Sequence, residues 1–110
     1  MIYIDPPYNT GNKNWKYNNN YIDKDDRYRH SKWLNMMNAR LLLAKDLLKP
    51  EGCLICAIDE NEYANLYLLL EQIFPDYNID AVTVVHNPRG IQGKNISKIF
   101  PLSLFIRFLG

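Results

Sequence analysis

Long apolar runs are missing from this 110-residue sequence. Since a membrane helix needs roughly 18 or more apolar residues in a row, no membrane span is expected. No basic segment precedes a shorter apolar run either, so the sequence does not predict a signal peptide. It also lacks the G-x-S-x-G, H-E-x-x-H and Walker patterns of several hydrolase, metalloprotease and nucleotide-binding families. A hydrophobic share of 47% with 23% charged residues is instead typical of one globular domain.

Cysteine and histidine are scarce too, with two of each. Cys53 and Cys56 have C-x-x-C spacing inside one apolar run, and in a strand residues three apart face opposite sides. We therefore expect buried, reduced thiols rather than a disulfide or a metal pair. His30 and His86 are far apart, with no cysteine or acid at ligand spacing, so no metal site is expected.

The charged residues are divided unevenly along the chain, although the net charge is only +1. Residues 1–49 contain nine Lys or Arg against five Asp or Glu, and residues 50–80 contain seven acids and no base. Residues 81–110 contain four bases and no acid. Basic loops on either side of an acidic segment could contact phosphate groups. Solvated surface charge explains the same pattern equally well.

Two segments carry the signals of an amphipathic helix. The first runs from Ser31, interpreted as the N-cap, to about Lys49, and it places apolar residues three or four apart on one face. The second begins with Asp59 and Glu62 at capping-box spacing and stops at Pro75. A second role for Asp59 stays open, because a residue that ends a strand could also line a binding site.

Four apolar runs rich in β-branched or aromatic residues are expected to be strands. They are residues 1–4, 53–58, 79–86 and 102–108. Strands that alternate with helices predict an α/β fold with a doubly wound, parallel sheet and right-handed crossovers. Residues 9–30 show no helical or strand period, and we interpret them as a substrate-side loop.

Residues Asp5-Pro6-Pro7-Tyr8 directly follow the first predicted strand. The prolines end that strand because neither donates a backbone N–H, so a rigid turn lies at its carboxyl end, where open α/β sheets bind ligands. The Asp5 carboxylate and the proline carbonyls are acceptors, and the Tyr8 ring is flat. Together they suit a planar base that carries an exocyclic amine. An ordinary strand-ending turn is the alternative interpretation.

The stretch from Tyr3 to Asn12 resembles the catalytic motif of amino-methylating DNA methyltransferases. It looks most like the modification (Mod) subunits of type III restriction systems and their β-class adenine-N6 relatives. Further segments follow in that family's order and at its spacing, namely 33–41, 52–62, Phe74 and 87–90. The resemblance covers residues 1 to about 98, so residues 99–110 are expected to be a divergent tail.

The resemblance implies one partial catalytic domain over residues 1–110, with a partial Rossmann-like methyltransferase fold. Its parallel strands would be joined by crossover helices, and its last two strands would form an antiparallel hairpin. The implied activity is methyl transfer from S-adenosylmethionine to the N6 amine of adenine in double-stranded DNA, within a restriction-modification system of the bacterial cytoplasm. By the family's motif, the catalytic residues are Asp5, Pro6, Pro7 and Tyr8, which would hold a flipped adenine.

The expected DNA contacts are polar and basic loop residues. They are Asn9, Lys13, Lys16, Arg89 and Lys94. A restriction subunit is the protein partner that the resemblance implies, and no membrane partner is expected. Exposed apolar edges of a partial fold would favour self-association.

One feature of the resembled family is absent, the F-x-G-x-G segment that approaches the methionine part of the cofactor. The five glycines, at positions 11, 52, 90, 93 and 110, do not form it. The cofactor-binding residues therefore stay unassigned, and we expect no methyl transfer by the isolated chain. The alternative is a truncated, catalytically inactive remnant that acts at most as a folded DNA- or partner-binding module.

Overall fold

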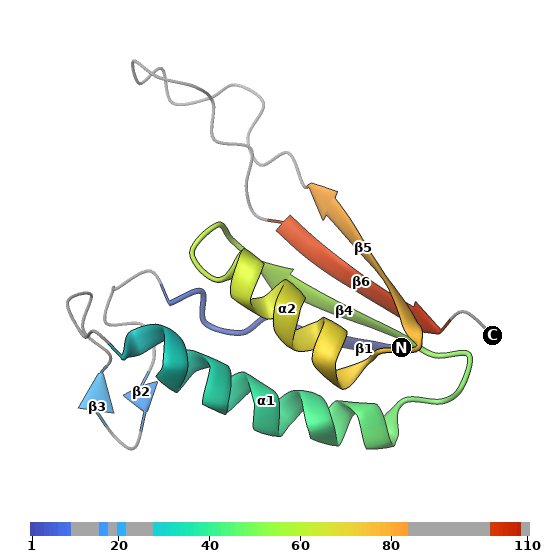
Figure 1. The fold of residues 1–110 in the computed structure, drawn as a ribbon, viewed down its shortest axis with the longest axis horizontal. Coiled ribbons are helices and arrows are strands. Elements are labelled where there is room, and N and C mark those ends of the chain that lie inside the picture. The colour runs from blue at the N-terminus through green and yellow to red at the C-terminus, as the bar shows by residue number, and fades with distance from the viewer. Residues whose placement is uncertain (10–15, 18–19, 22–27, 84–101, 109–110) are drawn as a thin grey trace, which may run out of the picture.

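The computed structural model describes residues 1–9, 16–17, 20–21, 28–83 and 102–108. In this part, two helices pack on one face of a four-stranded sheet (Figure 1). Neither of these helices is long and apolar enough to cross a membrane. The elements in chain order are β1 (Ile2–Ile4), β2 (Lys16–Tyr17), β3 (Asn20–Tyr21), α1 (Arg29–Leu47), β4 (Cys53–Ile58), α2 (Tyr63–Ile73), β5 (Tyr77–Thr83) and β6 (Leu102–Phe108).

The main sheet has the strand order β1-β4-β6-β5. β1 pairs parallel with β4, with Ile4 opposite Cys56, and α1 lies between these strands in the sequence. β6 lies between β4 and β5 and is antiparallel to both. The predicted α/β class and the parallel pairing of the first two main strands are confirmed. β5, however, does not pair with β4 as a wholly parallel sheet would require.

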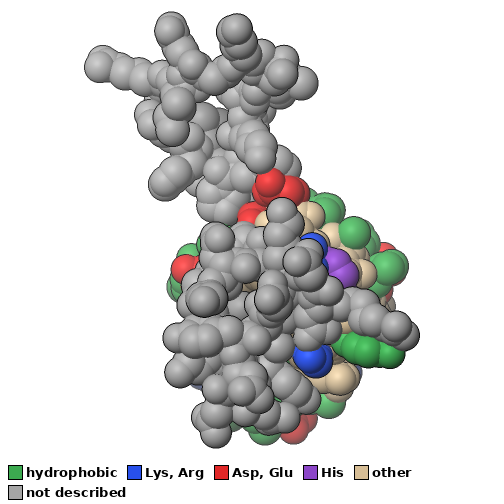
Figure 2. Space-filling model, turned by 90° about the vertical axis from the view of Figure 1, so that its left-hand side faces the viewer, with side chains coloured by type: hydrophobic (Ala, Val, Ile, Leu, Met, Phe, Trp, Pro, Cys, Tyr) green, Lys and Arg blue, Asp and Glu red, His purple; other side chains and the backbone are tan. Residues whose placement is uncertain are grey.

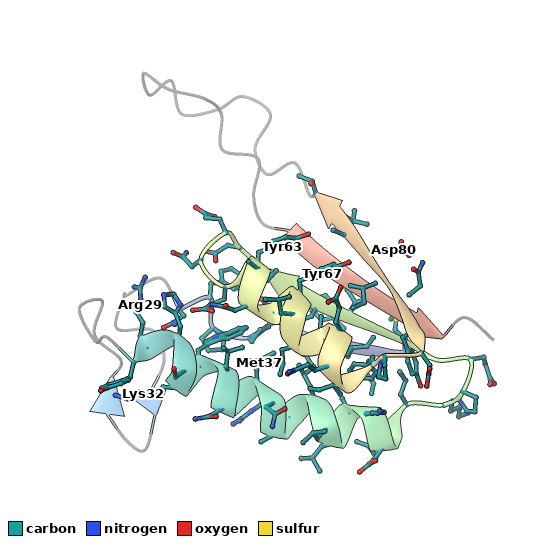
Figure 3. All side chains as sticks on the ribbon, in the orientation of Figure 1. Arg29, Lys32, Met37, Tyr63, Tyr67 and Asp80 are labelled. Atoms are coloured by element: carbon teal, nitrogen blue, oxygen red, sulfur yellow. The ribbon has the colours of Figure 1, made fainter. Side chains whose placement is uncertain are left out.

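The hydrophobic core lies between the sheet and the helices. On β4, Leu54, Cys56 and Ile58 are fully buried, which is the every-second-residue pattern of one covered face. The helices pack against that face with the buried residues Trp33, Met37, Leu41, Leu66, Leu70 and Ile73. Figure 3 shows Met37 pointing inward from α1. Because both helices cover the same face, the described residues do not form the doubly wound arrangement, and that prediction is wrong for this part.

α1 begins at Arg29 rather than at Ser31. Its N-cap is Tyr28, which makes no side-chain capping bond, and Ser31 is an exposed residue within the helix. The predicted Ser31 cap is therefore wrong, because contacts with the loop after β1 hold the first turn instead. The helix ends at Leu47, slightly before the predicted end.

α2 has Glu62 as its N-cap, but again without a side-chain capping bond. The predicted capping box is wrong, because the Asp59 carboxylate accepts hydrogen bonds from the backbone N–H and the side-chain amide of Asn61. Glu62 turns inward to other partners. The predicted end is confirmed, since α2 stops at Ile73, shortly before Pro75.

The strand predictions differ from the structure mainly at the strand ends. β4 and β6 have the predicted bounds, and β1 lacks only Met1. β5 begins at Tyr77, earlier than predicted, and residues 84–86 of the predicted strand lie outside the described part. Within the predicted loop 9–30, β2 and β3 form a short antiparallel pair that the sequence pattern did not indicate.

Candidate active site

The turn Asp5–Tyr8 leaves the sheet at the carboxyl end of β1, near the N-terminal ends of α1 and α2 (Figure 1). β1 and β4 are parallel neighbours, so the residues that follow them, Asp5 and Asp59, lie at the same edge of the sheet. Asp5 is exposed, whereas Pro6, Pro7 and Tyr8 are half-buried. The predicted site is thus an accessible feature of this edge.

Asp5 and Tyr8 are hydrogen-bonded to each other. The Tyr8 hydroxyl donates to Asp5 Oδ1 over 2.8 Å. Partial burial, then this hydrogen bond and the negative charge of Asp5, raise the pKa of Tyr8 to about 12. The phenol therefore stays neutral near neutral pH and remains a donor. Within the described residues Asp5 accepts no other hydrogen bond, which leaves its Oδ2 available to a ligand.

The two proline carbonyls have different surroundings. The Pro7 carbonyl accepts a hydrogen bond of 2.6 Å from the indole Nε1 of Trp33, whose side chain is fully buried. No hydrogen bond reaches the Pro6 carbonyl from the part of the chain that the structure describes. Of the Asp5 carboxylate and the two proline carbonyls, the oxygens without a partner among the described residues are therefore Asp5 Oδ2 and the Pro6 carbonyl oxygen.

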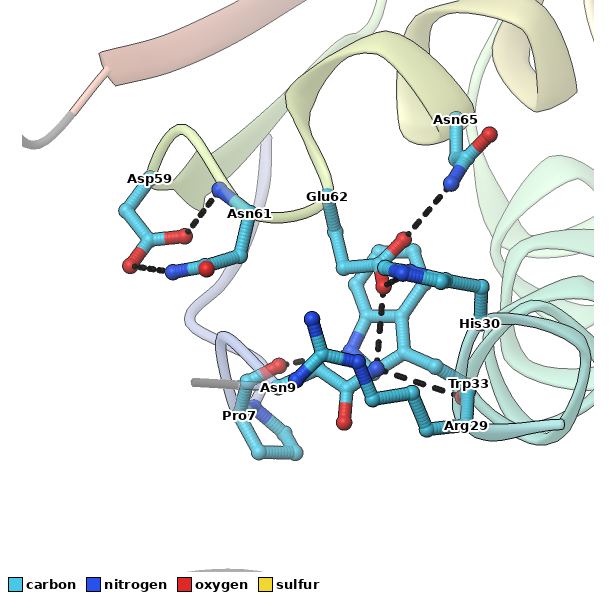
Figure 4. A network of polar contacts seen from close by, with 9 residues as sticks. All are labelled: Pro7, Asn9, Arg29, His30, Trp33, Asp59, Asn61, Glu62 and Asn65. Carbon is cyan, nitrogen blue, oxygen red and sulfur yellow. Dashed lines mark hydrogen bonds and ion pairs between the residues drawn. The ribbon is translucent and has the colours of Figure 1, made fainter. Parts of the chain in front are cut away.

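Asn9 anchors the chain just after the turn. Its side chain is fully buried, and its Nδ2 donates to the Arg29 carbonyl oxygen at 3.2 Å and to Glu62 Oε1 at 2.9 Å (Figure 4). Its backbone φ is 59°, in the left-handed region that asparagine tolerates better than most residues. For a residue with a Cβ this conformation still costs about 1–2 kcal/mol, so the side-chain contacts must hold it in place.

Glu62 is the centre of this polar cluster and is fully buried. Besides the bond from Asn9, its Oε1 is in hydrogen-bonding contact with His30 Nδ1, and its Oε2 accepts a hydrogen bond of 3.1 Å from Asn65 Nδ2. Both carboxylate oxygens are thus paired, which offsets the large cost of burying a charge. Because α1 has no acid in its own first turn, Glu62 supplies the negative charge that the N-terminus of this helix favours.

Both cysteines are free thiols, as predicted, but only Cys56 is buried, whereas Cys53 is half-buried. Burial, together with the charge of Asp5, raises the pKa of Cys56 to about 12, so this thiol is unreactive near neutral pH. Among the described residues, no group of three or more His, Cys, Asp or Glu side chains could hold a metal ion.

Comparison with known proteins agrees with the motif at this edge. Residues 1–101 match the family model described as DNA methylase. Over 99 residues the chain is 41% identical to the probable type III restriction-modification enzyme HindVI Mod subunit of Haemophilus influenzae, which covers 89% of this chain and 12% of that protein. Over 101 residues it is 35% identical to the EcoP15I Mod subunit of Escherichia coli, covering 71% of this chain and 16% of that protein.

A type II enzyme matches as well. Over 94 residues the chain is 36% identical to the methyltransferase M.KpnI of Klebsiella pneumoniae, which covers 84% of this chain and 22% of that protein. The chain belongs to the DNA methylase family. Its resemblance to Mod subunits, expected from the sequence, is confirmed. The chain spans between 12% and 22% of the length of these three relatives.

The DNA contacts expected of this DNA methylase chain are only partly within the described residues. The expected DNA contact of the Asn9 side chain is corrected by the structure, because this side chain is buried and binds the protein itself. The backbone of Lys16 lies in β2, and Lys13, Arg89 and Lys94 lie outside the described part. At the start of α1, Arg29 and Lys32 lie at this end of the molecule (Figure 3). Viewed onto this end, basic and acidic side chains both reach the surface (Figure 2).

A cofactor cradle is not recognisable among the described residues of this DNA methylase chain. Gly52 is the only glycine among them, and a Cβ there would lie 2.8 Å from both Leu48 Cδ1 and the Lys49 carbonyl oxygen. It closes the turn before β4, at the opposite end of that strand from the Asp5–Tyr8 turn. A groove of about 720 Å³ lies between α1 and α2, but none of its lining residues belongs to the turn.

Four residues of the polar cluster around the turn were not identified as such from the sequence. His30, Trp33 and Glu62 contact the turn, its next residue or each other, and the fourth residue, Asn65, only binds the second oxygen of Glu62. The spacing of Glu62 from Asp59 favoured a capping role for Glu62. Its partner Asn9 is 53 residues away in the sequence, and a local sequence pattern cannot indicate such a distant contact. The one available signal was that 33–41 and 52–62 resemble the family, which marked the segments but not the contacts.

Proposed function

We propose that this chain provides the base-binding part of a DNA methyltransferase that transfers a methyl group from S-adenosylmethionine to the N6 amine of adenine, in a restriction-modification system. The observation that carries the proposal is the difference among the acceptors of the turn. Asp5 Oδ2 and the Pro6 carbonyl accept no hydrogen bond from the described residues, whereas the Pro7 carbonyl and the Asn9 side chain bind other parts of the protein. The relatives named as Mod subunits and methyltransferases support it.

The reaction requires acceptors placed on the amine. The lone pair of an aromatic amine is delocalised into its ring, which makes the nitrogen a poor nucleophile. Hydrogen bonds from its two N–H groups to Asp5 and the Pro6 carbonyl would fix the nitrogen and localise that lone pair toward the methyl donor. Tyr8 would stack on the base once it has flipped from the duplex, and the two prolines keep the turn rigid.

For the fold, the proposal is a partial Rossmann-like methyltransferase domain whose antiparallel hairpin is formed by β5 and β6. The parallel pairing of β1 with β4 and the antiparallel pairing of β6 on both sides support it. Residues 1–110 would form one partial catalytic domain, with the divergent tail beginning near residue 99.

Methyl transfer needs a cofactor-binding segment that the 110 residues do not contain. S-adenosylmethionine supplies the methyl group when bound, and no residue of this chain is assigned to it. The absence of the F-x-G-x-G pattern favours a second candidate function, a catalytically silent module that binds DNA or a partner. The partners would be double-stranded DNA, through Lys13, Lys16, Arg89 and Lys94, a restriction subunit and a second copy of the chain, all in the bacterial cytoplasm.

The base-binding proposal is tested by measuring nucleoside affinity rather than the rate of methyl transfer. Adenosine and purine riboside differ only in the N6 amine, so the ratio of their Kd values measures recognition of that amine. We expect adenosine to bind about tenfold more tightly, because a hydrogen bond to a charged acceptor contributes roughly 1.5 kcal/mol. Asp5→Ala should reduce this preference, because only the uncharged Pro6 carbonyl then remains to accept from the amine.

Asp76→Ala is the matched control, because Asp76 is an exposed acid in the turn after α2. It should leave both Kd values unchanged. Equal affinity of the wild-type chain for the two nucleosides would contradict the base-binding proposal. Transfer of a labelled methyl group to DNA by the isolated chain, abolished in Asp5→Ala, would overturn the silent-module candidate.

A further inference from the structure

Glu62 connects three elements of the fold from a position closed to solvent. Its carboxylate binds Asn9 after β1, His30 in α1 and Asn65 in α2 (Figure 4). The Glu62 side chain is 0% exposed, whereas that of His30 is 45% exposed. A ligand that approaches from solvent can therefore reach the rim of this cluster but not its carboxylate.

Two of these contacts bear on the direction of the Asp5–Tyr8 turn. Asn9 directly follows Tyr8, and its anchored side chain maintains the left-handed backbone with which the chain leaves the turn. Trp33 lies three residues after His30, so both side chains leave neighbouring positions on one face of α1. Because Trp33 binds the Pro7 carbonyl, Glu62 acts on the turn directly through Asn9 and indirectly through His30.

We propose that Glu62 is a positioning residue for the base-binding turn, holding Asn9 and the first turn of α1 so that Asp5 and the Pro6 carbonyl face the base amine. This inference rests on the function proposed for the turn. Stability alone does not require a charge here, because well-packed apolar residues often replace buried ion pairs without loss. A carboxylate is the one side chain that can accept from Asn9, His30 and Asn65 together.

The test compares Glu62→Gln with Asn65→Ala by NMR of the folded 110-residue chain. Asn65 binds only Oε2, whereas Asn9 and His30 both bind Oε1, so Asn65→Ala disturbs the carboxylate without touching the turn. The indole N–H of Trp33 reports the Pro7 hydrogen bond, and the backbone amides of Tyr8 and Asn9 report the turn itself.

We expect Glu62→Gln to move all three resonances, with the Trp33 proton shifting toward the position of a solvent-exposed indole. Asn65→Ala should leave them in place. Unchanged resonances in Glu62→Gln, or equal shifts in both variants, would overturn the inference, because they indicate general packing. If Glu62→Gln does not fold, Asn9→Gly replaces it, since glycine keeps the left-handed backbone and removes only the anchor. The Trp33 indole N–H and the Tyr8 amide are then expected to shift, and unchanged positions of these two resonances overturn the inference.

Measuring adenosine affinity in the wild type and in both variants distinguishes a failure of this inference from a failure of the proposed function. We expect Glu62→Gln to weaken adenosine binding about tenfold, although Glu62 is closed to ligands, and Asn65→Ala to leave the affinity unchanged. An unchanged affinity in Glu62→Gln would overturn the positioning role. If the wild-type chain does not bind adenosine at all, the proposed function fails, and the resonances of Trp33, Tyr8 and Asn9 alone decide whether Glu62 positions the turn.

Discussion

The Asp5–Tyr8 turn and the cluster around Glu62 are adjacent but are built in opposite ways. The turn is exposed or half-buried, and within the described residues Asp5 Oδ2 and the Pro6 carbonyl are left without a hydrogen bond. The cluster is closed to solvent at Asn9 and Glu62, and no buried side-chain nitrogen or oxygen in the described part lacks a partner. The acceptors of the turn can stay open because neighbouring residues, and not the turn itself, fix the path of the chain.

Glu62→Ala should have the largest effect on stability. It leaves the Asn65 amide without its acceptor and the Asn9 amide with the Arg29 carbonyl alone. The upper limit for the loss is the cost of breaking a buried ion pair, about 3–5 kcal/mol. Because His30 is partly exposed, water can replace part of its lost contact, and we expect a loss of about 2–3 kcal/mol. The measurement is urea unfolding followed by circular dichroism, with the m-value checked for two-state behaviour.

Two exposed acidic residues serve as controls for the urea unfolding of Glu62→Ala and test whether the turn and the Glu62 cluster differ in their contribution to stability. Glu71→Ala removes an exposed glutamate from α2, and Asp5→Ala removes the exposed acid of the turn. Both should stay within about 0.5 kcal/mol of the wild-type stability, as expected for surface positions. A loss at Asp5 as large as the loss at Glu62 would show that the turn also supports the fold.

Trp33→Phe should have the next largest effect. The substitution keeps an aromatic ring in the core but removes the N–H that binds the Pro7 carbonyl, so we expect a loss of about 1–2 kcal/mol. The same unfolding experiment measures it. Met37→Leu, a volume-conserving change on the same helix, is the control for repacking. If Trp33→Phe costs no more than Met37→Leu, the hydrogen bond contributes little to holding the turn.

Asn9→Ala and Asn9→Gly should differ from each other, although both remove the anchor. Glycine adopts the left-handed φ of 59° without a Cβ penalty, whereas alanine does not. Asn9→Gly should therefore be more stable than Asn9→Ala by about 1 kcal/mol. Equal unfolding midpoints for the two variants would mean that position 9 is not left-handed in solution.

Much of the fold was predictable because its signals are local. The apolar runs gave the bounds of β4 and β6, and Pro75 marked the end of α2. The two helix starts were predicted wrongly, because a capping signal assumes that the side chain turns back to its own helix. Ser31 is exposed instead, and Glu62 turns inward to partners from other elements.

The candidate site also has a part that local sequence predicts, the turn, and a part that it does not, the residues that support the turn. The residue types in Asp5–Tyr8 were enough to predict a base-binding turn, since acceptors and a flat ring can be recognised within four residues. Its support was not predictable, because Asn9 and Glu62 meet only after α1 has carried the chain from β1 to β4. The burial of Asn9, which removes it from the expected DNA contacts, depends on the same long-range arrangement.

The smallest expected effect is a dependence of stability on pH, which comes from Tyr8 in the accessible Asp5–Tyr8 turn. The pKa of Tyr8 is raised from 10.0 to about 12, chiefly by burial and by the hydrogen bond to Asp5. In the unfolded chain the phenol ionises near its ordinary pKa, so this stabilisation is complete below pH 10.0 and is lost as the pH rises to about 12. The side chain that Tyr8→Phe introduces cannot ionise, so the stability of this variant should fall less than that of the wild type across this pH window.

The pKa of Cys56 is also raised, from 9.0 to about 12, in the wild type. This thiol is present in both proteins, so the difference between their unfolding curves isolates the contribution of Tyr8. Parallel declines would show that the Tyr8–Asp5 hydrogen bond does not persist in solution, and Asp5 would then offer both carboxylate oxygens to a ligand.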